Sequence, residues 1–138
     1  MNLSADDYLA IQQRYARYAS AIDLGDVDGW LESWTDEGSL HTSTGFSAEG
    51  RDALRAMAEA QVSNADERGY HWTANLVIEP TDYGASGQCY LMHLFVSEEL
   101  VTEQGRAGAQ LRYAYYYRDE LVREDGRWLF RRRTLNTL

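Results

Sequence analysis

The chain of 138 residues is poor in several features whose absence excludes whole classes of protein. Its single cysteine, Cys89, rules out an internal disulfide and is typical of a reducing compartment. Lys and Arg number 13 against 22 Asp and Glu, so the net charge of −9 argues against a surface for nucleic acid or an anionic membrane. No stretch approaches the roughly 18 apolar residues of a membrane span, and the N-terminus lacks the basic start of a signal peptide. We therefore expect a cytoplasmic protein.

The signatures of nucleotide and metal sites are also missing. The sequence contains no glycine-rich phosphate loop, nucleophile elbow or dinucleotide fingerprint. No pair among His41, His71 and His93 has ligand spacing on one element, so we expect neither a metal nor a cofactor. Cys89 carries no signal of a nucleophile and is expected to be a small buried hydrophobic residue.

What is present is an ordinary globular composition, with 44% hydrophobic and 25% charged residues. The length suits one domain with its own core, and no repeat, linker or low-complexity tract divides the chain. We expect a single domain over residues 1–138.

The N-terminal half has the spacing of helices. Ser4, with Asp7 three residues later, resembles a capping box and predicts a helix that ends at residues 24–26. Asp23 falls within the apolar arc of this helix, close to Ala16 and Ala19, whose small side chains could leave room for a ligand.

Further short elements are expected before residue 69. These are a helix over residues 28–34, a turn at 35–38, a short strand at 39–44 and a third helix from 50 to about 66. From residue 69 onward the hydrophobic period changes to two, which predicts strands over residues 70–79, 87–101, 109–124 and 127–136. Asp125-Gly126 before the last strand is a strong hairpin signal, because this pair suits turns with positive φ. Helices followed by an antiparallel meander predict an α+β fold.

The third long strand carries Tyr113, Tyr115 and Tyr117 on one face. This face is expected to pack against helices or a partner subunit, or else to line an aromatic cavity for a planar ligand. His93 shares a strand face with Leu91, which favours a core or interface histidine over a catalytic one.

Asp23 and His71 form the most informative pair. A carboxylate on an apolar helix face is costly without a partner, and the helix dipole does not stabilise it near a C-terminus. His71 opens a strand, HWTANLVIEP, and would form an Asp–His dyad with Asp23 if the fold brings the two together. Imidazole can then move a proton while the carboxylate fixes its tautomer. The alternatives are a strand-edge histidine satisfied by a backbone carbonyl and a carboxylate bonded to backbone beyond Gly25.

The order of elements and several local strings resemble the NTF2-like superfamily, and within it the SnoaL-like group. The strings are YARYASAIDLGD, WLESWTDEGSL, GRDAL, HWTANLVIE and YRDELVREDGRWLFRRR. The resemblance implies an α+β cone, in which a curved antiparallel sheet wraps on N-terminal helices around a pocket. It does not imply one function, because this superfamily contains enzymes, binding modules and proteins of unknown role.

A sharper resemblance concerns scytalone dehydratase, bile acid 7α-dehydratase and hexachlorocyclohexane dehydrochlorinase. These enzymes carry an Asp at the end of the first helix and a His opening a later strand, which are the places of Asp23 and His71. The resemblance also implies a pocket role for Tyr18 and for an arginine of the last strand. Arg133 is the best match for this arginine, with Arg131 and Arg132 left open.

Two other positions bear on this resemblance. Thr42 stands near the place where two of these enzymes use a tyrosine, which is a departure from their pattern. His93 lies near the place of a second pocket histidine in scytalone dehydratase.

Two hypotheses for function follow. In the first, the protein is a cofactor-independent lyase or isomerase, resembling a dehydratase or a polyketide cyclase. His71 would abstract a proton from carbon, Asp23 would hold the imidazole, and Tyr18 or Arg133 would stabilise the developing anion. In the second, it is a non-catalytic small-molecule-binding module, or an accessory subunit such as that of a ring-hydroxylating dioxygenase.

Under the second hypothesis an accessory subunit would also bind a larger enzyme, but other expectations about partners are the same for both. We expect a small apolar or aromatic molecule in the pocket, and neither nucleic acid nor membrane. We also expect a homodimer, with a trimer as the alternative, formed through an outer sheet face that carries Trp72, Leu76 and Ile78.

Overall fold

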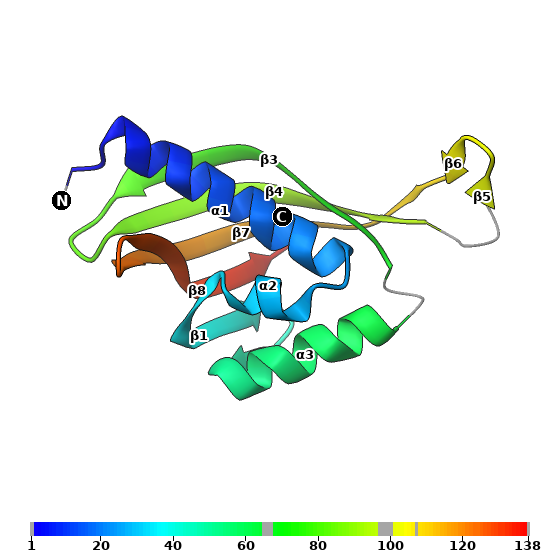
Figure 1. Cartoon of the computed structure of the whole chain (residues 1–138), viewed down its shortest axis with the longest axis horizontal. Coiled ribbons are helices and arrows are strands. Elements are labelled where there is room, and N and C mark those ends of the chain that lie inside the picture. The colour runs from blue at the N-terminus through cyan, green and yellow to red at the C-terminus, as the bar shows by residue number, and fades with distance from the viewer. Residues whose placement is uncertain (1, 65–67, 97–100, 107, 138) are drawn as a thin grey trace.

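The computed structural model describes residues 2–64, 68–96, 101–106 and 108–137 (Figure 1). Its helices are α1 (Ala5–Asp23), α2 (Val27–Leu31) and α3 (Arg51–Ser63). Its strands are β1 (Trp34–Thr42), β2 (Ser47–Glu49), β3 (Gly69–Pro80), β4 (Ala85–Phe95), β5 (Val101–Thr102), β6 (Gly105–Arg106), β7 (Gln110–Glu124) and β8 (Arg127–Asn136). The α+β class predicted from the sequence is confirmed. None of the described helices is long and apolar enough to cross a membrane.

The main sheet has the strand order β2-β1-β8-β7-β4-β3, while β5 and β6 form a separate hairpin. Its neighbouring strands are antiparallel except for β1 and β8, which run parallel. In Figure 1, α1 crosses in front of the long strands and α3 lies beside β1 at the lower edge. Helices therefore cover the curved sheet, as expected for an NTF2-like cone.

The first helix is built as its sequence predicts. Ser4 accepts a hydrogen bond from the Asp7 backbone N–H, and the Asp7 carboxylate accepts one from the Ser4 backbone N–H at 2.9 Å, which completes a capping box. The apolar arc of α1 is buried, and its buried residues are Ile11, Tyr15, Tyr18, Ala19 and Ile22. Asp23 is the last residue of this helix.

The segment between α1 and α3 differs from the prediction. The second helix ends at Leu31, three residues earlier than expected, and β1 already begins at Trp34. Residues 35–38 therefore lie in a strand and not in a turn. They form an irregularity in the pairing of β1 with β8, where the register shifts between Trp34 and Ser39. A β-bulge of this kind keeps the chain extended while it interrupts the regular pairing, so turn-like residues fit it.

Two predicted ends fall partly outside the described residues. α3 ends at Ser63, and the predicted continuation to about residue 66 falls on positions 65–67. β4 ends at Phe95, and most of the predicted continuation to residue 101 falls on positions 97–100.

A second bulge changes which residues of β3 face outward. Asn75 has a φ of 57°, and the pairing with β4 shifts register between Ala74 and Val77. After this shift Leu76 and Ile78 pack against the core, whereas Trp72 is 58% exposed. The prediction that Leu76 and Ile78 share the outer face with Trp72 is therefore wrong, because one inserted residue reverses the side-chain parity.

The core contains a cluster of aromatic rings between α1, α2 and the sheet. Ring centroids lie 5.1 to 5.9 Å apart in tilted or edge-to-face pairs that link Tyr15, Tyr18, Trp30, Trp34 and Phe130. This cluster fills the space beneath the middle of α1, and the cavities described next lie toward its C-terminal end.

Candidate functional site

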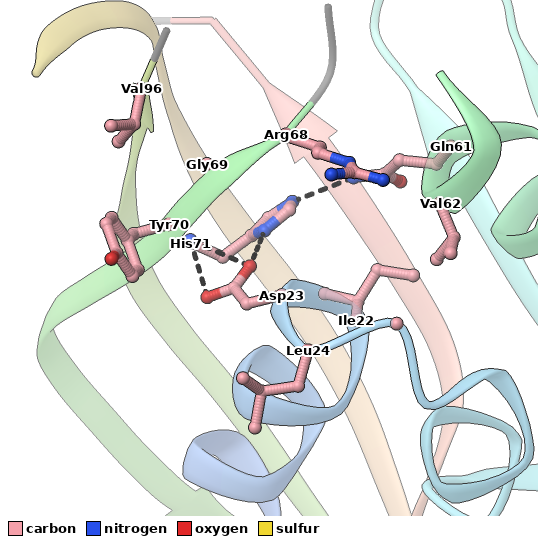
Figure 2. Close-up of a pocket in the computed structure, with 11 residues that line it drawn as sticks. Ile22, Asp23, Leu24, Gln61, Val62, Arg68, Gly69, Tyr70, His71 and Val96 are labelled. Atoms are coloured by element: carbon pink, nitrogen blue, oxygen red, sulfur yellow. Dashed lines mark hydrogen bonds and ion pairs between the residues drawn. The ribbon is translucent and has the colours of Figure 1, made fainter. Parts of the chain in front are cut away.

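Two cavities meet at His71. The first, here called the α1–β3 cavity, has a volume of about 480 Å³ and is lined by the end of α1, the end of α3 and the start of β3 (Figure 2). The second, here called the aromatic cavity, has a volume of about 650 Å³. Ile22, Gln61 and His71 line both cavities, so they form the boundary between them.

Asp23 and His71 are in direct contact at this boundary. The Nδ1 atom of His71 lies 2.6 Å from Oδ1 of Asp23. The backbone N–H of His71 also donates to the same carboxylate, at 3.1 Å to Oδ1 and 3.0 Å to Oδ2. Figure 2 shows both sets of bonds joining the end of α1 to the start of β3. The side chains are 14% and 13% exposed, so the pair is shielded and still accessible from the cavities.

This geometry determines which nitrogen of His71 is free to act as a base. A nitrogen 2.6 Å from a carboxylate oxygen must carry a hydrogen, because two lone pairs would repel at that distance. Nδ1 is therefore the protonated nitrogen, and Nε2 of the neutral ring carries the lone pair. An Nε2 lone pair that faces a cavity is the arrangement required of a general base.

A third residue, Gln61, contacts this base nitrogen. The Nε2 amide group of Gln61 lies 3.2 Å from Nε2 of His71 and donates to its lone pair. Gln61 was not predicted from the sequence, although its signal was present. It follows Leu54 by seven residues and Met57 by four, so it continues the apolar row of α3 with a polar side chain.

His93 and the tyrosines of β7 extend the site into the aromatic cavity. The ring of His93 is 3% exposed, and its centroid lies 4.8 Å from that of His71. Tyr113 stacks on His93 at 6.1 Å, and Tyr115 stacks on Tyr113 at 5.9 Å. These residues and Tyr117 line the cavity, and Tyr117 also packs against Tyr18 of α1 with 6.5 Å between ring centroids, so this strand face both lines an aromatic cavity and packs against a helix.

Tyr18 lies in the wall of the aromatic cavity and is 5% exposed. Burial raises the pKa of its hydroxyl, and the nearby positive charge of Arg133 only partly opposes this. The hydroxyl therefore stays protonated at neutral pH and is available as a hydrogen-bond donor.

Thr42 lines the same cavity but is already engaged. Its Oγ1 accepts from the Phe46 backbone N–H at 3.1 Å and lies 2.9 Å from Oγ1 of Thr44. The threonine therefore stabilises the turn after β1, which fits its departure from the tyrosine of the related enzymes.

Arg133 is the inward-facing member of the arginine triplet, but it does not reach the ligand space. It is fully buried and donates from Nε and Nη2 to the two carboxylate oxygens of Asp119, each at 2.8 Å. Arg133 is not among the described residues that line either cavity. The expectation that it meets the substrate directly is not supported, since Asp119 neutralises it and aromatic rings surround it.

The other candidates from the sequence, Arg131, Arg132 and His41, lie outside both cavities. Arg131 pairs with Glu120 on the surface at 2.8 Å, and Arg132 is exposed. His41 lies 3.0 Å from the Ser39 hydroxyl, outside the lining of both cavities. Among the described residues, no group of three or more His, Cys, Asp and Glu side chains could hold a metal ion.

The α1–β3 cavity also contains a cation that was not predicted from the sequence. Arg68 lies just before β3 and lines this cavity together with Tyr70 and Leu24 (Figure 2). The lining of the α1–β3 cavity is thus a mixture of charged and apolar groups, whereas the aromatic cavity is lined mainly by rings and aliphatic side chains.

Comparisons with known proteins agree with this fold. Residues 4–134 match the SnoaL-like domain. A Mycobacterium tuberculosis protein of unknown function is 29% identical, with a TM-score of 0.78 over 94% of this chain and 70% of that chain. Aln2 from a Streptomyces species is 25% identical, with a TM-score of 0.82 over 99% and 94%. A Catenulispora acidiphila protein in complex with S-DNPA is 25% identical, with a TM-score of 0.80 over 96% and 94%. No curated protein matches the chain.

Proposed function

The chain belongs to the SnoaL-like domain family, and on this basis we propose that it is a cofactor-independent lyase or isomerase with His71 as its general base. The observation that carries the proposal is the 2.6 Å contact of His71 Nδ1 with Asp23, which leaves Nε2 at the boundary of two cavities. Family membership supports the coarser statement that this is a small-molecule-binding fold. The proton-transfer chemistry rests on the dyad.

The proposed reaction begins with a substrate that has an acidic C–H next to a carbonyl group. Nε2 of His71 takes the proton, and the electron pair of the C–H bond moves onto the carbonyl oxygen to form an enolate. Asp23 accepts the Nδ1–H bond throughout and stabilises the imidazolium that forms. The enolate then takes a proton at another carbon, expels a leaving group or attacks a second carbonyl, which gives an isomerase, a lyase or a cyclase. The proton held on Nε2 of His71 passes to that carbon, to the leaving group or to the new alkoxide, which restores the neutral base.

Tyr18 is the proposed donor to the enolate oxygen. Its hydroxyl is protonated and buried in the wall of the aromatic cavity, where a fixed donor is worth more than in water. Arg133 lies behind it, 4.3 Å from the centre of its ring. In this proposal Arg133 positions Tyr18 and does not touch the substrate.

The proposed substrate is a small, mostly apolar or aromatic molecule. A volume of about 650 Å³ falls within the range of roughly 300 to 1,000 Å³ that is usual for small-molecule pockets. The rings of Tyr113, Tyr115, Tyr117 and Trp30 suit a planar ligand.

Deuterium exchange at carbon tests the proposal with a panel of candidate substrates. Ketones, β-hydroxyketones and halogenated compounds are incubated with the protein in D2O, and loss of the C–H signal is followed by NMR. We expect the His71→Gln variant to lose roughly 10²- to 10⁴-fold in exchange rate at an unchanged melting temperature. His41→Gln, outside both cavities, is the matched control. Full exchange activity in His71→Gln would overturn the proposal.

The second candidate is a non-catalytic binding module or an accessory subunit. The observation that favours it is the backbone N–H of His71, which donates to both carboxylate oxygens of Asp23. This contact joins α1 to β3 whatever the imidazole ring does. On this reading Gln61 and Asp23 only satisfy a part-buried histidine. His71→Gln should then lower the melting temperature clearly, and wild-type protein should exchange no proton of any ligand that it binds.

Self-association is proposed through the outer face of β3 and β4. The pairing places Tyr70 opposite Leu94, Trp72 opposite Met92 and Ala74 opposite Tyr90. Exposed fractions of 54% for Tyr70, 58% for Trp72 and 43% for Tyr90 leave a row of aromatic rings uncovered. Exposed apolar patches of this kind mark interfaces, and a second copy of the chain is the proposed partner.

A further inference from the structure

We propose that Gln61 is a displaceable cap, which occupies the base nitrogen of His71 until a ligand enters the site. The role of this cap in catalysis rests on the proposed function, whereas the hydrogen bonds that define the cap do not. With Nδ1 bonded to Asp23 and Nε2 bonded to Gln61, both ring nitrogens of His71 are engaged. A proton from a ligand can reach Nε2 only after the amide of Gln61 has moved.

The position of Gln61 makes it a barrier as well as a cap. It is one of the three residues, with Ile22 and His71, that line both the α1–β3 cavity and the aromatic cavity. Figure 2 shows its side chain reaching from α3 across the cavity toward the His71 ring. A molecule that occupies both cavities must therefore displace this side chain.

One hydrogen bond holds the side chain of Gln61, whereas its backbone is fixed in a helix. The backbone carbonyl of Gln61 accepts a hydrogen bond from the Asn64 N–H at 3.3 Å in the last turn of α3. Within the described part of the chain, the hydrogen bond to His71 is the only one that the Gln61 side chain makes. Release therefore breaks one hydrogen bond, which a ligand can replace.

The amide of Gln61 can contact neutral His71 and charged His71 only through different ends. The NH2 group donates to the lone pair of neutral His71, whereas only the carbonyl end can accept from an imidazolium Nε2–H. The observed contact, through the amide nitrogen, belongs to the neutral ring. A carboxylate at this position could only accept, and would hold His71 in its charged form.

Modification by diethyl pyrocarbonate tests the cap without any substrate, because the lone pair of a neutral imidazole attacks a carbonyl carbon of this reagent. The rate at His71 is measured at pH 7 by tandem mass spectrometry, which separates it from His41 and His93. We expect Gln61→Ala to react about fivefold faster than wild type, the factor that corresponds to one net hydrogen bond. Gln61→Glu should react more slowly than wild type. Gln13→Ala, exposed on α1, is the control and should react as wild type does.

Equal rates for wild type and Gln61→Ala would overturn the cap. Each variant is first compared with wild type by its melting temperature, and Gln61→Asn, whose shorter amide does not reach Nε2, replaces the alanine variant if that one does not fold. The result is independent of the test of function. If Gln61→Ala is modified faster than wild type and His71→Gln keeps its exchange activity, the cap is retained and the general base is rejected. If Gln61→Ala is modified at the wild-type rate and His71→Gln loses its exchange activity, the general base is retained and the cap is rejected.

Discussion

Asp23 accepts hydrogen bonds from two donors of one residue, the ring Nδ1–H of His71 at 2.6 Å and its backbone N–H at 3.0 and 3.1 Å. An ionised carboxylate can serve both donors because both of its oxygens accept. In an asparagine the NH2 group replaces one of these two oxygens, so it opposes either the backbone N–H or the ring Nδ1–H of His71. The contact therefore sets the tautomer of His71 and the position of its backbone together.

The Asp23→Asn variant should lose the fixed Nδ1–H tautomer of His71. We expect ¹⁵N NMR of the ring to show a mixture of tautomers, and deuterium exchange to fall by roughly 10²- to 10⁴-fold, as in other dyads with the wrong tautomer. Asp82→Asn, an exposed change in the turn before β4, is the control. A variant with an unchanged tautomer would show that Asp23 does not orient the ring.

Asp7 provides a prediction about acid stability. Hydrogen bonds from the backbone and side chain of Ser4, with a further one from Trp128, lower the pKa of Asp7 from 3.8 to about 2. A carboxyl group whose pKa is lower in the folded state stabilises the fold above its unfolded pKa. This stabilisation is lost as the pH falls from about 4 to about 2.

The Asp7→Asn variant should therefore melt below wild type at pH 5 and approach it at pH 2. The measurement is the melting temperature across this range, with Asp6→Asn, the exposed neighbour in the same turn, as the control. A difference between Asp7→Asn and wild type that is constant from pH 5 to pH 2 would contradict the assignment.

At the scale of elements, one buried ion pair joins three of them. Asp119 on β7 accepts two hydrogen bonds from Arg133 on β8 and one from the hydroxyl of Tyr15 on α1. Burial raises the pKa of Tyr15 well above its usual value, so this hydroxyl remains a donor. Gly87 on the neighbouring strand has no Cβ to obstruct Tyr15, because a Cβ there would lie only 2.1 Å from the tyrosine oxygen.

Asp119→Asn should be strongly destabilising, because it leaves the buried charge of Arg133 without its partner. We expect a loss of roughly 3 to 5 kcal/mol in the free energy of unfolding, measured by urea denaturation. The adjacent Glu120→Gln removes the exposed partner of Arg131 and should cost at most about 1 kcal/mol. Similar losses for the two variants would contradict the role of the buried pair.

The elements that the sequence predicted well are those whose signals are local. The capping box of Ser4 and Asp7 and the Asp-Gly turn depend on neighbouring residues, and the turn has the expected positive φ at Asp125 (48°) and Gly126 (77°). The bulge at Asn75 depends on how β3 pairs with β4, so alternation along one strand could not reveal it. The parallel pairing of β1 with β8 depends likewise on residues about 95 positions apart.

In the candidate site, too, the features with local signals could be predicted and those that depend on distant residues could not. A carboxylate on an apolar helix face indicates that a partner is needed, and the expected contact of Asp23 with His71 is present. The apolar row of α3 could have revealed Gln61 as an inward-facing polar residue. It could not have revealed that Gln61 contacts Nε2 of His71. The burial of Arg133 behind Tyr18 follows from Asp119, whose inward orientation depends on the sheet as a whole.

At the scale of the whole molecule, the two faces of the sheet have different surroundings. The inner face carries the aromatic core and the dyad beneath the helices. The outer face of β3 and β4 carries Tyr70, Trp72 and Tyr90 without cover. Removal of three such rings from water would favour association, while a net charge of −9 on each copy opposes close approach at low salt. The balance favours an interface centred on the rings and strengthened by salt.

Trp72→Glu should abolish self-association, because it places a carboxylate at the centre of the proposed interface. Light scattering at micromolar concentration should give wild type twice the mass of the 15.8 kDa chain, and the variant the mass of one chain. Leu9→Glu, on an equally exposed position of α1, is the control and should retain the wild-type mass. A wild-type mass of three chains that the Trp72 variant still reduces to one would keep the interface and change the symmetry. A single-chain mass for wild type would refute the interface, because Trp72 would then remain 58% exposed in solution with no second copy to cover it.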